Sequence, residues 1–134
     1  MVKRENDCHL WEELSVIKVE IDMTLPTFDE YADICGANNV RSVKYKKHLM
    51  EDIGIFIGRL PEHEKDIAII FHWIGWQDRG IDDVCLAKKL ILDALVHYDK
   101  LSIQNRLMGL MVGSFQDRFS HGEETKVILE IMEV

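Results

Sequence analysis

Apolar and polar residues alternate along residues 16–24, which is the pattern of a half-buried β-strand. The apolar positions that share one side are Ile17, Val19, Ile21 and Met23. The positions on the other side are Lys18, Glu20 and Asp22. Pro26 has no backbone N–H to donate to a sheet, so the strand is predicted to end just before it.

Residues 67–76 are apolar on both sides of a strand, apart from His72. This composition predicts a central strand that is covered on both faces. A helix is predicted on each side of it in the sequence. Apolar residues near helical spacing predict the first over residues 42–60, ended by Pro61. The second is predicted to start at Asp82 or Asp83, as the N-cap, and to run to about residue 98.

The C-terminal part of the chain predicts two more strands, over residues 107–115 and 126–134, joined by a polar linker over residues 116–125. The predicted order is strand-helix-strand-helix-strand-strand. It indicates an α+β fold in a single compact domain, with a four-stranded mixed sheet and two main helices, over residues 15–134. Residues 1–14 are interpreted as an N-terminal extension.

The composition agrees with one soluble domain. Of the 134 residues, 47% are hydrophobic and 30% are charged, a balance typical of globular proteins. No apolar run reaches the roughly 18 residues that a membrane span needs, and the first residues lack the pattern of a signal peptide. The sequence therefore predicts a cytoplasmic protein with no membrane partner.

The charge of the chain limits its partners. It contains 24 acidic and 16 basic residues, for a formal net charge of −8. Binding to nucleic acid gains free energy when lysine and arginine neutralise phosphates. A chain with net negative charge is therefore less suited to bind nucleic acid, unless basic residues gather on one face. The acid-free basic cluster of the sequence consists of Arg41, Lys44, Lys46 and Lys47.

Motifs for dinucleotide binding, phosphate-binding loops and hydrolase elbows do not occur. Cys8, Cys35 and Cys85 are widely spaced, which predicts neither a disulfide framework nor a zinc site.

The dense polar segment is residues 78–83, between the central strand and the second helix. On that helix Asp82, Lys89 and Asp93 would share one face. Carboxylates at such a junction are typical of Mg²⁺ sites in enzymes that cleave phosphodiesters. A capped helix with an exposed ion pair explains the same residues.

Several segments, in order, resemble the RusA family of phage and prophage Holliday-junction resolvases, in its Gram-positive branch. LPTFDEY (25–31) is similar to the family's LPSxNEY, and KYKK (44–47) to its lysine-rich helix start. Residues 79–95 resemble the segment RDxDN followed by KKxxLDAL. IQNR (103–106) resembles IxND, and FQDRF (115–119) resembles FTDxF. The resemblance covers roughly residues 16–134.

The resemblance implies a small homodimer with Mg²⁺-dependent endonuclease activity on four-way DNA junctions. The family binds its metal through two aspartates of DxDN and one of the IxND element. The first position is Gly80 here, the second is Asp82, and the third is Arg106, or Gln104 if the gap is placed differently. Two unit charges about 4 Å apart interact by about 4 kcal/mol at an effective dielectric constant of 20, so an arginine would oppose a divalent ion.

We therefore expect a set of catalytic residues that has lost its activity, with no bound cofactor. Mg²⁺ would be bound only if the protein is still an active endonuclease. Asp82 would be at most a weak metal ligand. The remaining members are Asp83, Lys88 and Lys89. A displaced site that also uses Asp78 and Asp99 is the alternative.

The resemblance also implies a DNA-facing role for the basic cluster and for Arg79. The alternative for the cluster is a solvated helix start, compensated by Glu51 and Asp52 one turn later.

The expected function is that of a RusA-like phage or prophage protein in a bacterial host cell. We expect it to be catalytically inactive and reused as a protein-binding inhibitor or regulator, of the anti-defence or derepressor type. The alternative is a divergent but active Mg²⁺-dependent crossover-junction endodeoxyribonuclease. The expected partners are a second copy of the chain and either a basic protein or a DNA four-way junction.

Overall fold

Four strands form one mixed sheet in the order β1-β4-β2-β3. The structure is a computed structural model, and it describes residues 16–37, 39–61, 67–102, 106 and 115–133. The strands are β1 (Val16–Ile21), β2 (Ile67–Ile74), β3 (Phe115–Ser120) and β4 (Lys126–Glu133). β4 pairs antiparallel with both β1 and β2, and β3 pairs parallel with β2. The predicted α+β class with a four-stranded mixed sheet is confirmed.

The strand register places the apolar positions of neighbouring strands side by side. Ile21 of β1 lies opposite Val127 of β4, which lies opposite Trp73 of β2. Leu129 and Phe71 form the next pair on the same face. All five side chains are buried, so the period-two pattern of the sequence produces one continuous apolar face across the sheet.

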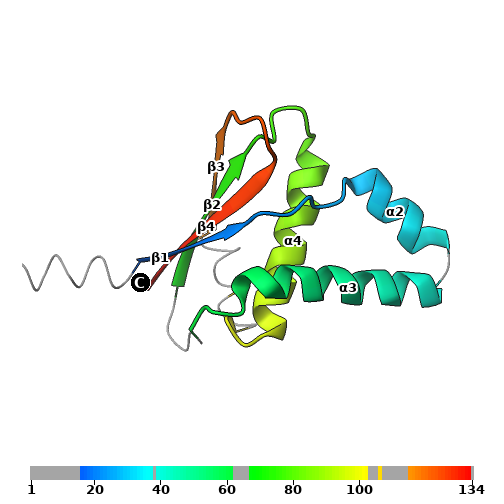
Figure 1. Ribbon diagram of the computed structural model, residues 1–134, viewed down its shortest axis with the longest axis horizontal. Coiled ribbons are helices and arrows are strands. Elements are labelled where there is room, and N and C mark those ends of the chain that lie inside the picture. Colours follow the sequence, from blue (N-terminus) through cyan, green and yellow to red (C-terminus); the bar gives the residue numbers. More distant parts are fainter. Residues whose placement is uncertain (1–15, 38, 62–66, 103–105, 107–114, 134) are drawn as a thin grey trace, which may run out of the picture.

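Three helices lie on the side of that face: α2 (Phe28–Ala37), α3 (Asn39–Ile57) and α4 (Ile81–His97), and α2 packs on the other two. Figure 1 shows α4 along the sheet, α3 crossing beside α4, and α2 beyond α4 on the side away from the sheet. On the opposite face of β2, Ile70 is buried, whereas His72 and Ile74 are half-buried. The helices therefore cover one face of β2 fully, and the other face, where cover was also expected, is partly exposed.

Helix α2 was not predicted from the sequence, and it makes three helices where two main ones were expected. Thr27 and Glu30 form a capping box at its start. The Thr27 hydroxyl accepts a hydrogen bond from the Glu30 N–H at 3.2 Å, and the Glu30 carboxylate accepts one from the Thr27 N–H at 3.3 Å. The signal was present in the sequence as Thr-x-x-Glu, directly after the proline that ends the preceding extended segment.

The start of α4 differs from the prediction by two to three residues. Its N-cap is Gly80, so Asp82 and Asp83 lie in the first turn and neither is the N-cap. Acidic residues in a first turn are favourable because the helix macrodipole places partial positive charge there.

β3 corrects the last part of the predicted order. Residues 116–125 were predicted to be a linker, whereas β3 includes residues 116–120. Its sequence, FQDRFS, is mostly polar and exposed, and parallel pairing with residues 69–74 of β2 holds it in the sheet. The predicted strand over residues 107–115 falls, up to residue 114, outside the described residues, as does the N-terminal extension 1–14.

The turn after β2 requires glycine at position 75. Gly75 has φ of 77°, and a Cβ atom there would overlap the carbonyl oxygen of Glu124. Its N–H donates a hydrogen bond to the carbonyl of Ser120 at 3.1 Å. The position therefore allows neither a side chain nor a shift of the backbone.

Gly75→Ala is expected to lower the free energy of unfolding by about 2 kcal/mol or more, because the clash adds to the strain at positive φ. Urea denaturation measures this loss. Gly36→Ala in α2 is the control, since nothing lies within 4 Å of its Cβ position; it should be neutral or stabilise by up to about 1 kcal/mol. Equal effects of the two substitutions would contradict this account of the turn.

Candidate functional site

The start of α4 contains residues of the expected catalytic set, and among them Asp83 accepts hydrogen bonds from two backbone amides. Its Oδ1 accepts a hydrogen bond from the Phe28 N–H at 2.7 Å, and its Oδ2 accepts one from the Gly80 N–H at 3.2 Å. The Phe28 amide is the first of α2. Asp83 thus ties the starts of two helices together. Asp82, beside it, is exposed and forms no hydrogen bond or ion pair with the described residues.

Arg79 strengthens the same junction. Its guanidinium donates a hydrogen bond to the Leu25 carbonyl at 2.9 Å and lies over the Trp76 ring, with Cζ 4.7 Å from the centroid. Leu25 is almost fully buried and precedes α2 by three residues. The segment that leads into α2 is therefore held from one side by Arg79 and from the other by Asp83.

Lys88 and Lys89 differ in their surroundings. The Lys88 ammonium lies 3.2 Å from Oδ2 of Asp117 on β3, and 5.2 Å from the centroid of the Phe71 ring. The other oxygen of Asp117 accepts a hydrogen bond from the Trp73 indole at 2.9 Å. Lys88 thus joins α4 to β3, whereas Lys89 is exposed.

The third ligand position of the resemblance, Arg106, lies far from Asp82. The Arg106 guanidinium pairs with the carboxylate of Asp93. Asp93 is eleven residues beyond Asp82 on α4, which is about 16 Å along the helix axis. Oxygen ligands of one Mg²⁺ lie about 2.1 Å from the ion, so they cannot be this far apart. Gln104, the other candidate, lies outside the described residues.

The ligand set implied by the resemblance does not fit a magnesium ion here. Asp82 has one carboxylate neighbour in sequence, Asp83, whose two oxygens already accept backbone hydrogen bonds. Over the described part of the chain, no three His, Cys, Asp or Glu side chains gather closely enough to share a metal ion.

Asp93 belongs to a second polar cluster, between the three helices. A small pocket there is lined by Tyr31, Lys46, Asp93 and three apolar residues. Burial, contact with Cys35 and the charge of Asp93, in that order, raise the pKa of Tyr31 to about 12. The phenol is therefore neutral at physiological pH, and its O–H is engaged with Cys35.

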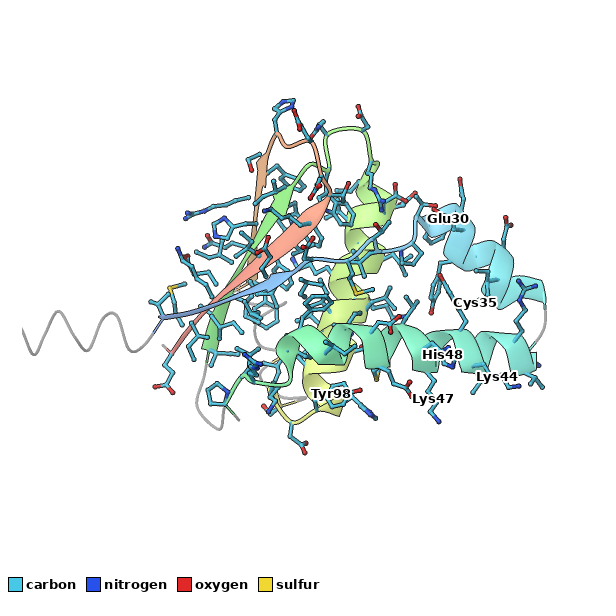
Figure 2. All side chains as sticks on the ribbon, viewed as in Figure 1. Glu30, Cys35, Lys44, Lys47, His48 and Tyr98 are labelled. Atoms are coloured by element: carbon cyan, nitrogen blue, oxygen red, sulfur yellow. The ribbon has the colours of Figure 1, made fainter. Side chains whose placement is uncertain are left out.

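The basic cluster on α3 spreads over more than one side of the helix. All four side chains are exposed: Arg41, Lys44, Lys46 and Lys47. Figure 2 shows Lys44 and Lys47 on the side of α3 that faces away from α2. Lys46 lines the pocket beside Asp93 and also shares a groove with Lys47, so it lies between the two sides of the helix.

The basic cluster and Asp82 also lie near opposite ends of α4. Lys46 and Lys47 line a groove with His97 and Tyr98, at the C-terminal end of the helix. His97 is fifteen residues from Asp82, or about 22 Å along the axis. The expected catalytic residues and most of the expected DNA-binding residues therefore do not form one compact site.

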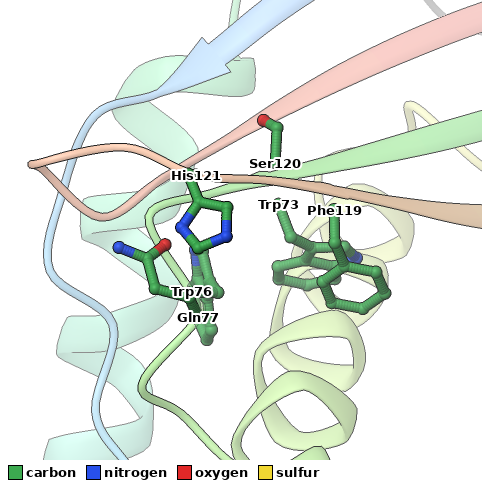
Figure 3. Close-up of a pocket in the computed structure, with 6 residues that line it drawn as sticks. All are labelled: Trp73, Trp76, Gln77, Phe119, Ser120 and His121. Atoms are coloured by element: carbon green, nitrogen blue, oxygen red, sulfur yellow. The ribbon is translucent and has the colours of Figure 1, made fainter.

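A pocket at the end of the sheet was not predicted from the sequence. It has a volume of about 140 Å³ and is lined by Trp73, Trp76, Gln77, Phe119, Ser120 and His121 (Figure 3). Trp73 and Trp76 are almost completely buried, as expected of residues at the core and rim of the central strand. The sequence signal that was overlooked is Phe119, an aromatic residue in a polar segment.

No protein-family model matches the sequence, and no curated protein matches it at a significant level. No described helix combines the length and the apolar character that crossing a membrane requires.

Asp83→Ala should lower the free energy of unfolding by about 1–2 kcal/mol, because two backbone N–H groups lose their acceptors. Asp82→Ala is the matched control, one residue away on the same turn, and should change it by less than about 0.5 kcal/mol. Urea denaturation of both variants checks the expectation. An Asp82→Ala loss as large as that of Asp83→Ala would show that Asp83 does not hold the junction.

Proposed function

We propose that this protein is a RusA-like, catalytically inactive binding protein of phage or prophage origin, which acts in the bacterial cytoplasm as an inhibitor or regulator of another protein. The observation that carries the proposal is the use of the candidate catalytic side chains as internal ties. Asp83 holds the starts of α2 and α4, and Lys88 holds β3. A catalytic carboxylate or lysine needs to be free to contact the ion or the phosphate.

The charge distribution favours a basic protein as the partner. Several basic side chains are already paired with acids inside the domain: Lys18, Lys88, Arg106 and Lys126. Exposed acids such as Asp78, Asp82 and Glu123 form no ion pair with the described residues. Unpaired surface acids raise the rate at which a positively charged protein associates and oppose the approach of DNA.

A DNA junction is the second candidate partner, because Lys44 and Lys47 are exposed on one side of α3. Glu51 lies four residues after Lys47 on the same side, which reduces the local positive charge. The proposed homodimer would use the face of the sheet opposite the helices, where Ile74, Ile128 and Met132 are half-buried.

Incubation with a synthetic four-way junction and Mg²⁺ or Mn²⁺ is expected to give no cleavage. Gel shifts should show junction binding no tighter than binding to linear duplex. The double variant Lys44→Glu with Lys47→Glu should bind the junction weakly. The control variant Arg59→Glu with Lys100→Glu, which has the same net charge, should bind it equally weakly. Junction cleavage that Asp82→Asn abolishes would overturn the proposal in favour of an active endonuclease.

Light scattering should give about twice the chain mass of 15.6 kDa at micromolar concentration, because the proposed dimer buries the half-exposed apolar side chains of the sheet. A species of 15.6 kDa at this concentration would contradict the dimer without affecting the proposed inactivity.

A further inference from the structure

The pocket at the end of the sheet has two facing walls. Figure 3 shows Trp73 and Phe119 on one side, and Trp76, Gln77 and His121 on the other. The rings of Trp73 and Phe119 are nearly parallel, with an interplanar angle of 21° and centroids 6.5 Å apart. Trp73 also meets Trp76 edge to face, with centroids 4.9 Å apart, so the two sides touch at these rings. The rings of Trp73, Trp76 and Phe119 therefore border the pocket.

Phe119 is exposed although it stands in the wall of an apolar pocket. Its exposed fraction is 59%, whereas that of Trp73 is 0%. Complete burial of a phenylalanine side chain is worth about 1.5–3 kcal/mol. Much of that free energy is still available here, so a ligand that covers Phe119 gains it on binding.

Internal contacts hold the other lining side chains in place. The Trp73 indole donates to Asp117 at 2.9 Å, and the Trp76 indole donates to the Lys126 carbonyl at 3.1 Å. The Gln77 amide donates to the Gly122 carbonyl at 2.9 Å. A pocket whose walls are already ordered costs little conformational entropy when a ligand enters.

The volume selects a small ring. The pocket measures about 140 Å³. An apolar cavity of roughly 150 Å³ binds one benzene molecule. The pocket volume is therefore close to that of a cavity that holds one phenyl ring. The Gln77 side-chain oxygen and the His121 ring form no hydrogen bond with the described residues. Either group can therefore form a hydrogen bond with the hydroxyl of a tyrosine ring in the pocket.

The charge of residues near the pocket in the sequence indicates which kind of molecule the bound ring belongs to. Asp78 follows Gln77 in the sequence, and Glu123 and Glu124 follow His121 by two and three residues. All three are exposed, and none forms an ion pair with the described residues. We call these acids, which follow lining residues in the sequence, the acidic rim; their charge favours lysine and arginine over the phosphates that accompany a nucleobase.

The position of β3 favours an extended peptide. Among the described strands β3 has one neighbour, β2, and it forms one end of the strand order. A peptide that pairs along an edge strand places alternate side chains in adjacent pockets. Phe119 belongs to β3, and His121 directly follows it.

We propose that this pocket binds one phenylalanine or tyrosine side chain from a lysine- or arginine-rich segment of a partner protein. The inference rests on the proposed protein-binding function and identifies the anchor by which it acts. The partner is recognised by an aromatic ring in the pocket and by basic residues against Asp78, Glu123 and Glu124.

The test titrates the full-length, isotope-labelled chain with acetyl-Lys-Lys-Phe-Lys-Lys-amide and observes the indole N–H signals of Trp73 and Trp76 by NMR. The peptide should shift these signals and bind about tenfold more tightly than the same peptide with alanine at its centre, since ring burial supplies about 1.4 kcal/mol or more. Glu123→Lys with Glu124→Lys should weaken binding, because the rim then repels the peptide. Equal binding of the two peptides would overturn the proposal.

Phe119→Ala removes one wall and should weaken binding of the phenylalanine peptide by about fivefold or more. Ile81→Ala is the matched control, because Ile81 is an exposed apolar residue (73%) outside the pocket lining. Both variants should keep the wild-type melting temperature within a few degrees. Unchanged affinity in Phe119→Ala would contradict the proposed anchor.

Single-stranded oligothymidine is the competing probe. Shifts of the same indole signals at a lower concentration of oligothymidine than of peptide would assign the pocket to a nucleobase and overturn the proposal. This result differs from a failure of the proposed function. Cleavage of the four-way junction would overturn the proposed function whether or not the peptide binds.

Discussion

The hydrogen bonds of Asp83 set the arrangement of the three helices. One carboxylate accepts from the first amide of α2 and from the amide that precedes α4, although the two lie far apart in the sequence. Arg79 holds the Leu25 carbonyl just before α2. The entry to α2 is therefore fixed against the start of α4, and this in turn positions α3, which packs on both. A side chain that accepts hydrogen bonds at the starts of two helices has a structural role, which explains its presence without invoking catalysis.

The ion pairs of the domain use charged residues in the same way. Lys88 joins α4 to Asp117 on β3, and Asp117 in turn orients the indole of Trp73. Arg106 meets Asp93 between the helices, about three turns from Asp82. Charges that resemble a phosphodiester-cleaving site in the sequence thus act in the structure as links between elements. Acids such as Asp78, Asp82 and Glu123 form no ion pair with the described residues and lie on the surface.

Regular periodicity made much of the fold predictable. The alternation in β1, the apolar run of β2 and the helical spacing in α4 each have a strong period, and each element forms close to its predicted bounds. α2 was not predicted because Pro26 indicates the end of a strand, and the capping box that starts the helix follows it directly. β3 was missed because its residues are polar and its order comes from pairing with β2, a long-range contact. The pocket brings Trp73 next to Phe119 through the same pairing, so no local pattern could reveal it.

The central claim, that the start of α4 is a structural junction and not a metal site, is tested most directly by paramagnetic Mn²⁺. Trace Mn²⁺ added to the isotope-labelled protein broadens the amide signals near any site that binds it. The account predicts no selective broadening of the amides of residues 79–84, and the same response in Asp82→Asn. Selective broadening centred on Asp82, lost in Asp82→Asn and competed by Mg²⁺, would contradict it.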